Sequence, residues 1–235
     1  QKMRQQDPTD PLLLQVLPQA KEAIQRPDFN DDPLEEASFN PVPGVVHKYQ
    51  GRALLIAASH CAINCRYCFR RHYPYAEQKR ARSQWQESLH YIEQQTDIEE
   101  IILSGGDPLA LTDTLLFDLI SAVEKIPHIK RLRIHSRLPI VLPQRITLSL
   151  CQRLESSRLT CVMVVHANHA NELAQDVAQA CALLREHKVQ LLNQSVLLAQ
   201  VNDNLKALKN LSERLIDIGV MPYYLHAPDR VEGTT

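Results

Sequence analysis

Three cysteines, Cys61, Cys65 and Cys68, lie within eight residues in the run CAINCRYCFRR. A loop this short can bind three irons of a cubane iron–sulfur cluster through one thiolate each, which leaves the fourth iron without a protein ligand. An open iron of this kind is a site for chemistry. Two other interpretations stay open: three buried small apolar side chains, or part of a zinc site whose fourth ligand lies elsewhere. Charged neighbours such as Arg66 and Arg70 argue against an inert core.

A second group of polar residues follows short apolar runs along the chain. Gly105 and Gly106 expose backbone groups where side chains would block a ligand, and Asp107 could accept hydrogen bonds from an ammonium. The alternative for this segment is a tight turn after a strand. Further polar residues stand where later apolar runs end: Ser104, His135, Ser136, Arg137, His166, Asn168, His169, Asn193, Gln194, His226 and Asp229. In parallel α/β proteins these ends meet at one edge of the sheet, so we expect one site there.

Short apolar runs alternate with longer amphipathic ones from Arg52 onward. We predict strands at 53–59, 100–105, 131–136, 160–166, 190–198 and 220–226, and helices at 83–95, 113–125, 145–156, 172–187 and 204–218. Strict alternation implies parallel strands with right-handed crossovers. Either an open doubly wound sheet or a barrel satisfies this pattern. Six β/α units in order, without a dinucleotide glycine fingerprint, favour an α/β fold with a partial (β/α)6 barrel.

Local signals refine these elements. Asn204 should open the last helix and Gly219 should end it, while Asp113 should cap a helix that begins at Thr114. The predicted strand 131–136 places Arg131, Arg133, His135 and Arg137 on one face, but the sequence does not decide whether that face points inward. The following run, LPIVLPQRIT, is expected to be a loop packed on the barrel.

Residues 1–50 differ from the rest because they contain many of the prolines. Proline spacing allows short helices at most, near 12–25, and otherwise extended chain. Valines and a tyrosine in 34–50 give this stretch apolar surface to bury. We therefore predict two parts: an N-terminal arm, 1–50, packed on a barrel, 51–235.

The composition is that of an ordinary globular protein. The 235 residues are 44% hydrophobic and 23% charged, with a formal net charge of -1. This balance gives no bulk charge to attract nucleic acid or a membrane surface. No apolar run reaches a membrane span, and the polar start does not read as a signal peptide. Cys151, Cys161 and Cys181 lie in apolar patterns and are expected in the core. These features predict a cytoplasmic enzyme.

The cysteine spacing, with Tyr67 before the third cysteine, resembles the signature of the radical S-adenosylmethionine (SAM) enzymes. A closer resemblance rests on many motifs, which are DPLEE, VHKYQGRALL, CAINCRYCFRRHYPY, SGGDPL, RIHSRLPIVLPQRIT, HANHANE, LLNQSVLL, VNDN and PYYLHAPD. Together they resemble the lysine 2,3-aminomutase family from about residue 7 to the end. Within it, the chain is most similar to the branch that makes (R)-β-lysine for modification of elongation factor P.

The resemblance implies a radical SAM barrel and three cofactors: a [4Fe–4S] cluster, SAM and pyridoxal 5′-phosphate (PLP). Moving an amino group from the α- to the β-carbon of lysine requires removal of an inert hydrogen. The resemblance implies that the cluster and SAM generate the radical that removes it, and that PLP carries the nitrogen. The cofactors supply the chemistry and the protein positions them.

Cofactor contacts carry over by position. The resemblance implies cluster ligation by Cys61, Cys65 and Cys68, and SAM contacts from Tyr67, from Gly105, Gly106 and Asp107, and from His166 and Gln194. Either of the last two could instead be a core polar residue. The PLP phosphate contacts would be Tyr49 and Arg52, together with Lys48, which stands where free-lysine enzymes commonly have arginine. The PLP-binding lysine of the family follows the sixth strand and has no counterpart in this chain, which is expected to be a piece of a longer protein.

Two charged residues carry over as substrate contacts. Arg70 resembles the arginine that pairs with the substrate carboxylate, for which its planar fork is suited. Asp229 resembles the carboxylate that receives the side-chain ammonium of lysine. The alternative for each is a surface ion pair of little consequence.

Two rival functions remain at this stage. One is a catabolic lysine 2,3-aminomutase that gives (S)-β-lysine; the other is an electron-transfer or binding module that holds a cluster without catalysis. The predicted partners are lysine, a reductant protein such as flavodoxin or ferredoxin, an elongation factor P lysylation enzyme that takes the product, and a second copy of the chain in a homo-oligomer. Neither nucleic acid nor a membrane is expected.

Overall fold

The computed structural model describes residues 2–75 and 84–234 and contains one seven-stranded sheet. The strands are β1 (Val45–Tyr49), β2 (Arg52–Ala58), β3 (Glu100–Gly105), β4 (Arg131–Ser136), β5 (Thr160–His166), β6 (Gln190–Val196) and β7 (Met221–His226). They lie side by side in chain order, with β2 to β7 parallel. Among these strands β1 and β7 do not pair, so the sheet is curved but not closed. The predicted partial (β/α)6 barrel is confirmed.

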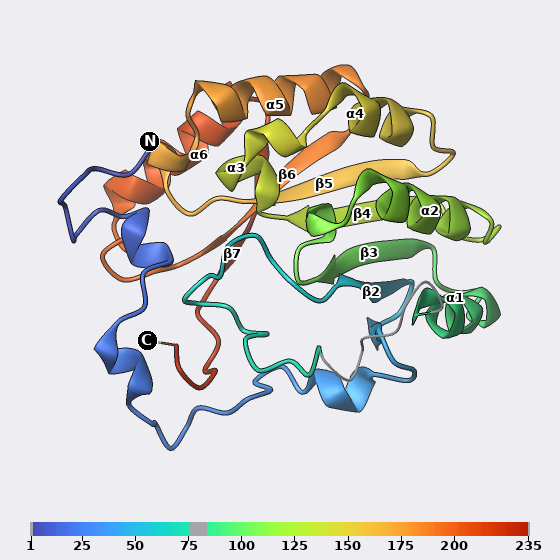
Figure 1. The fold of residues 1–235 in the computed structure, drawn as a ribbon, viewed down its shortest axis with the longest axis horizontal. Helices are drawn as coiled ribbons and strands as arrows, with labels where there is room; N and C mark the ends of the chain where they lie inside the picture. Colours follow the sequence, from blue (N-terminus) through green and yellow to red (C-terminus); the bar gives the residue numbers. More distant parts are fainter. Residues whose placement is uncertain (1, 76–83, 235) are drawn as a thin grey trace.

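Among the described residues, five helices alternate with the parallel strands as predicted, and a sixth is very short. They are α1 (Gln84–Gln94), α2 (Asp113–Glu124), α3 (Leu138–Val141), α4 (Leu148–Glu155), α5 (Gln175–Glu186) and α6 (Leu205–Asp217). Residue 83, the first of the predicted helix 83–95, lies outside the described residues. Figure 1 shows the helices along one face of the sheet, which leaves the other face for the chain's N-terminal part.

The sheet's two faces differ in chemistry, and this settles the orientation of β4. Leu132 and Ile134 are fully buried in the core between sheet and helices. Arg133 and His135 alternate with them and therefore lie on the opposite, open face. The strand 131–136 thus presents its basic residues to the inside of the partial barrel, where Arg133 also lies over the ring of Tyr223 on β7 at 5.8 Å.

Two local predictions need correction. Helix α2 begins at Asp113, and Thr112 caps it by accepting a hydrogen bond from the backbone N–H of Leu115. A threonine oxygen can reach that N–H as well as an aspartate can, so the cap lies one residue earlier than predicted. The run LPIVLPQRIT is not all loop, because α3 and a 3₁₀ turn, Pro143–Arg145, form within it. Proline is tolerated in a first helical turn, where its missing N–H has no partner to lose.

The other helix signals behave as predicted. The Asn204 side chain accepts a hydrogen bond from the N–H of Ala207 at 2.9 Å and opens α6. Gly219 follows α6 with a φ of +73°, a backbone conformation that glycine adopts without steric cost. Cys151, Cys161 and Cys181 are buried in the core, as expected.

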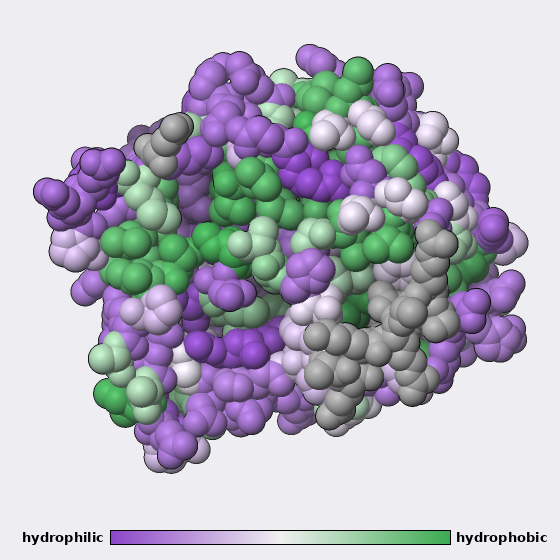
Figure 2. Space-filling model, viewed as in Figure 1, coloured by the Kyte–Doolittle hydropathy of each residue, from purple (hydrophilic) through white to green (hydrophobic). Residues whose placement is uncertain are grey.

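The N-terminal arm crosses the open side of the sheet and contains three short 3₁₀ helices, Leu13–Gln15, Ala20–Ala23 and Glu36–Phe39. Its last part is more regular than predicted: β1 pairs antiparallel with β2 at the sheet edge. Figure 1 shows the arm, in blue, beside the red end of the chain, and a backbone bridge joins Asn30 to Val231 there. Figure 2 shows mostly hydrophilic residues along the lower edge, where the arm runs.

Candidate functional site

The cysteine loop follows β2 directly and turns back on itself at its end. The backbone N–H of Cys68 donates to the carbonyl of Cys65 at 3.2 Å, so these two thiols come from one turn. Cys65 and Cys68 are half-buried and Cys61 is exposed; all three are free. Burial raises the pKa of the Cys68 thiol. Burial thus favours the neutral thiol in the free chain, whereas a metal ion holds a coordinated thiol in its deprotonated form.

The glycines after β3 hold the start of this loop. A Cβ added to Gly106 would lie 2.3 Å from the carbonyl oxygen of His60, and one added to Gly105 would lie 2.7 Å from that of Ala58. The N–H groups of Gly106 and Asp107 donate to the same two carbonyls, at 2.8 and 2.9 Å. The two glycines are therefore needed for close packing of two backbones, whatever they do for a ligand.

Asp107 is not the open acceptor that the sequence predicted. Its Oδ1 accepts from the Leu109 N–H and from the Ser136 hydroxyl, and its Oδ2 accepts from the N–H groups of Arg137 and Leu138. A carboxylate has about four acceptor sites, so all of them are in use. Asp107 thereby ties the end of β3 to the turn after β4. Burial raises the pKa of this carboxyl, which is 5% exposed.

Arg70 is buried at the open face of the sheet. Its Nε and Nη2 donate to the two oxygens of Glu36 at 2.7 and 2.6 Å, and its Nη1 donates to the Ser104 hydroxyl at 3.0 Å. Glu36 belongs to the arm and Ser104 to β3, so Arg70 joins three parts of the chain. A guanidinium has five N–H groups. Within residues 2–75 and 84–234, one N–H on each terminal nitrogen has no acceptor, and these two groups suit a second carboxylate.

Arg137 is the centre of a second buried network. Its Nη1 donates to Cys65 Sγ at 2.7 Å, and its Nη2 donates to Gln15 Oε1 at 2.7 Å and to Glu172 Oε2 at 3.3 Å. The Asn168 amide donates to the same Gln15 oxygen. The arm, the cysteine loop and the ends of β4 and β5 are therefore connected through one guanidinium.

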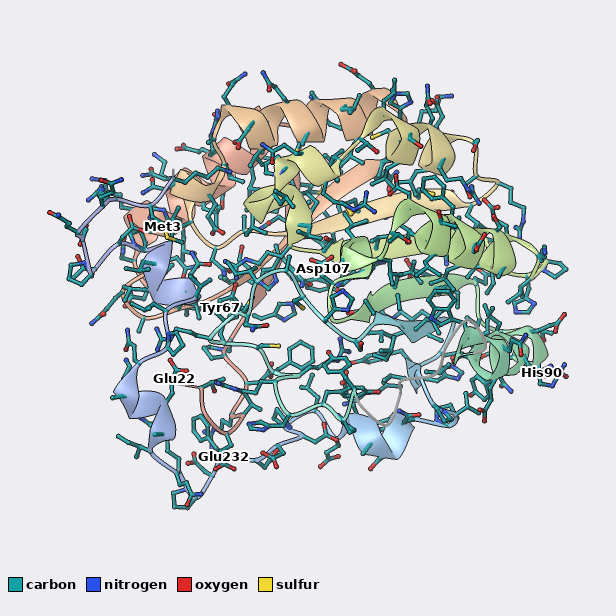
Figure 3. The ribbon with its side chains drawn as sticks, viewed as in Figure 1. Met3, Glu22, Tyr67, His90, Asp107 and Glu232 are labelled. Carbon is teal, nitrogen blue, oxygen red and sulfur yellow. The ribbon has the colours of Figure 1, made fainter. Side chains whose placement is uncertain are left out.

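Tyr67 and His166 pack together beneath this network. Their rings meet edge to face with centroids 5.6 Å apart, and the Tyr67 hydroxyl accepts from Asn168 at 2.6 Å. His166 pairs in register with Gln194 of the neighbouring strand. Figure 3 shows Tyr67 between the arm and the sheet, with Asp107 nearer the strands and His90 remote on α1. The predicted SAM contacts on the loop, β5 and β6 thus lie at one end of the sheet.

Three buried nitrogens at this end have no hydrogen-bond partner within residues 2–75 and 84–234: His135 Nε2, His166 Nε2 and Arg137 Nε. Burial lowers the pKa of His135 and of His166 to about 3, helped by nearby arginines. Both imidazoles are therefore neutral near pH 7. Unpaired buried polar atoms are costly, and their concentration here fits a site that receives a polar ligand.

Asp229 lies beyond β7 on the same side. It is half-buried, and burial raises the pKa of its carboxyl, while His226 opposes the rise. Glu36, the partner of Arg70, also contributes to the rise.

The three predicted PLP phosphate contacts divide into two groups. Arg52 lies over the ring of Tyr49, 4.7 Å from its centroid. Lys48 instead donates to the Leu34 carbonyl at 3.1 Å and lies 5.0 Å from the ring of Phe39, both in the arm. Tyr49 and Arg52 are brought together, whereas Lys48 is occupied elsewhere.

Gln15, Glu36 and Glu172 were missed by the sequence interpretation. Glu172 had a local signal, because His169 and Glu172 form a capping box around a 3₁₀ turn. Gln15 and Glu36 lie in the proline-rich arm, where no periodic pattern marks a buried position. All three are at least nine-tenths buried, and each pairs with a residue far away in the chain.

The donor set fits a cluster better than a single ion. In the described part of the chain, no three His, Cys, Asp or Glu side chains are arranged to hold one metal ion. A zinc ion needs its ligands in one coordination sphere, whereas each thiolate of a [4Fe–4S] cluster binds a different iron. The zinc interpretation therefore has no support from these residues. None of the helices within residues 2–75 and 84–234 has the length and hydropathy of a membrane span.

Comparisons with known proteins identify the family of this chain. A family model described as a 4Fe-4S single cluster domain matches residues 49–134. L-lysine 2,3-aminomutase of Escherichia coli K12 is 53% identical over 99% of the chain and 68% of its own length. The Haemophilus influenzae protein of that name is 50% identical over the whole chain and 69% of its length. L-lysine 2,3-aminomutase of Clostridium subterminale is 38% identical over 95% of the chain and 54% of its own length. The chain therefore belongs to the lysine 2,3-aminomutase family of radical SAM isomerases, whose cofactors are a [4Fe–4S] cluster, SAM and PLP.

Proposed function

We propose that this chain forms the cluster- and lysine-binding part of an enzyme that converts L-lysine to (R)-β-lysine for modification of elongation factor P. The observation that carries the proposal is the position of Arg70, which is buried at the open face of the sheet two residues after Cys68. Two of its N–H groups have no acceptor in the part of the chain that the structure describes. An arginine tethered beside the cluster and open to a second carboxylate suits an amino acid substrate.

Arg70 and Asp229 bind the two ends of lysine in this proposal. The remaining N–H pair of Arg70 grips the α-carboxylate, while Glu36 and Ser104 hold the guanidinium in place. The ammonium of the side chain meets Asp229, whose raised pKa falls when a cation arrives. When bound, the cluster and SAM supply the radical that removes a β-hydrogen, and PLP supplies the carrier for the migrating nitrogen.

The three cofactors are bound by separate groups of residues in this proposal. Cys61, Cys65 and Cys68 hold the cluster, and the neutral His166, Tyr67 and Gln194 border the SAM nucleoside. Because Asp107 is saturated, the SAM amino group is left to the backbone of Gly105 and Gly106. Tyr49 and Arg52 bind the PLP phosphate. The arm covers the open face and helps to exclude water from the radical.

The choice of branch rests on two sequence features. The run YCFRRHYPY and Lys48 are typical of the elongation-factor branch, whereas catabolic enzymes that give (S)-β-lysine commonly have arginine at position 48. Lys48 contacts the arm through Leu34 and Phe39, which a single ammonium can do without a fork. The proposal includes a cytoplasmic location, a flavodoxin- or ferredoxin-type reductant, a lysylation enzyme that takes the product, and a homo-oligomer.

The test is product analysis with the full-length, anaerobically reconstituted protein. It is incubated with L-lysine, SAM, PLP and dithionite, and β-lysine is separated on a chiral column. (R)-β-lysine supports the proposal, and (S)-β-lysine assigns the catabolic function instead. A protein that holds its cluster but forms no β-lysine is a binding or electron-transfer module. Asp229→Asn is the matched variant: the cluster stays and turnover falls.

A further inference from the structure

Arg137 combines three properties that the proposed reaction does not yet use. Its side chain is 8% exposed, its Nη1 donates to Cys65 Sγ at 2.7 Å, and its Nε has no hydrogen-bond partner in the described residues. The guanidinium also lies 5.6 Å from the ring centroid of Tyr67. A buried cation in contact with a cluster thiolate acts on the electrons of that cluster.

The position of Arg137 is fixed from several sides. Its Nη2 donates to Gln15 Oε1 at 2.7 Å and to Glu172 Oε2 at 3.3 Å, and its backbone N–H donates to Asp107 Oδ2 at 2.8 Å. The amide of Gln15 is itself anchored, since its Nε2 donates to Pro11 and to Glu172. The guanidinium therefore cannot leave Cys65 without breaking contacts to the arm and to the segment after β5.

The cysteine loop is held in the same place by a second set of contacts. The backbone N–H of Arg66 donates to the Gln15 carbonyl at 3.0 Å, and the Arg66 side chain binds the Leu14 carbonyl and Glu22. Gln15 thus contacts the cysteine loop through its backbone and Arg137 through its side chain. Loop and guanidinium are positioned relative to each other by one residue of the arm.

We propose that Arg137 is a positioning residue that donates a hydrogen bond to the Cys65 thiolate and thereby raises the reduction potential of the cluster. Reduction adds one negative charge, and a nearby cation with an N–H directed at a ligand sulfur stabilises the more negative form. The inference rests on the proposed function only in taking Cys65 as a cluster ligand. That point is tested separately by the iron content of Cys65→Ala.

The experiment compares two variants of the reconstituted full-length protein. Glu172→Gln removes the anion but keeps an acceptor oxygen for the N–H groups of Asn168 and His169. The double variant Arg137→Met/Glu172→Gln also removes the guanidinium without leaving a buried carboxylate unpaired. Iron content is measured first, and the midpoint potential is then determined by electron paramagnetic resonance during redox titration.

We expect the double variant to bind iron like Glu172→Gln and to have a lower midpoint potential. At a fixed ambient potential its ratio of reduced to oxidised cluster should fall about tenfold, which is a shift of about 59 mV for one electron. Arg137→Lys should recover part of the shift. Arg153→Met, at the opposite end of the sheet, should leave the potential unchanged. Equal midpoint potentials in the double variant and Glu172→Gln would overturn the proposal.

A second measurement decides the case if the double variant does not load iron. The unaltered protein is labelled with arginine carrying ¹⁵N only in its guanidinium, and nitrogen coupling to the reduced cluster is recorded by pulsed electron paramagnetic resonance. Arg137→Lys should abolish the strongest coupling, whereas Arg71→Lys should not. The same coupling in Arg137→Lys and the unaltered protein would mean that Arg137 does not contact the cluster.

Discussion

The Arg153–Glu124 pair at one end of the sheet differs in burial, and in what it connects, from the Arg70–Glu36 and Arg137–Glu172 pairs at the other end. At the amino ends of the strands, Arg153 pairs with Glu124 at 2.8 Å between neighbouring helices, with side chains 17% and 20% exposed. At the carboxyl ends, the side chains of Arg70 and Glu36 are 7% and 10% exposed, and those of Arg137 and Glu172 8% and 6%.

This difference in burial distinguishes ion pairs that contribute to stability from ion pairs that surround the functional site. A partly exposed ion pair such as Arg153–Glu124 contributes little to the free energy of unfolding. A buried pair must overcome the desolvation of two charges, and an apolar pair of similar volume would often serve stability as well. Buried pairs that connect the arm, the cysteine loop and the strand ends are therefore best explained by the site that they surround. Four predictions test this division.

The largest effect is expected for the cysteines of the loop. Each of Cys61→Ala, Cys65→Ala and Cys68→Ala should prevent assembly of about four irons per chain, because each thiolate binds its own iron. Iron and sulfide analysis after anaerobic reconstitution is the measurement. Cys151→Ala, in the buried core, is the control and should load iron normally. If Cys151 proved as necessary as the loop cysteines, the ligand assignment would be wrong.

Glycine substitutions should show the next largest contrast between the two ends. An alanine at Gly106 would place its Cβ 2.3 Å from the His60 carbonyl, so the start of the cysteine loop must move and the iron content should fall. Gly51, at the amino end of β2, has a φ of +79° and its nearest contact at 4.0 Å. Gly51→Ala should cost about 1–2 kcal/mol in unfolding free energy and leave iron loading intact. Normal iron loading in Gly106→Ala would contradict the close approach.

Arg70 and its neighbour Arg71 allow a test of the substrate contact at the carboxyl ends of the strands. Arg70→Lys keeps the charge but cannot hold Glu36 and a substrate carboxylate with parallel hydrogen bonds. Loss of one charge-assisted bond costs about 1.5–3 kcal/mol, so β-lysine formation should fall about 10- to 150-fold.

Arg71 is the matched control for that change. It is exposed and lies 3.7 Å from Glu22, and it also contacts the Gly233 carbonyl. Arg71→Lys should reduce turnover only slightly. Rates are compared at saturating SAM and PLP, with the cluster content of each variant measured. A larger effect at Arg71 than at Arg70 would remove Arg70 from the substrate site.

The smallest effect is expected at the amino ends of the strands. Arg153→Met should lower the free energy of unfolding in urea by about 1 kcal/mol or less, because the pair with Glu124 is partly exposed. Iron content and turnover should not change. A loss of iron in this variant would show that the two ends are coupled, which contradicts the division drawn above.

The alternation of apolar runs was sufficient to predict the order and type of the main elements from the sequence. Parallel strands and amphipathic helices have different hydrophobic periods, and this difference is local. The cap at Asn204 and the stop at Gly219 are likewise set by one residue each. The cysteine spacing and the family motifs predicted a cluster enzyme of the aminomutase family, and the comparisons confirm the family.

Only the tertiary structure decided which side chains pair with one another by hydrogen bonds and ion pairs. The sequence shows that Arg70 and Asp107 are charged residues near a motif. It does not show that Glu36 occupies one side of Arg70, or that four donors saturate Asp107. These contacts join segments about 30 or more residues apart, where no periodic pattern records which side chains meet. Gln15 lies 122 residues from Arg137 and 157 residues from Glu172 in the chain. Its burial follows from how the arm lies across the sheet, and that depends on the whole fold.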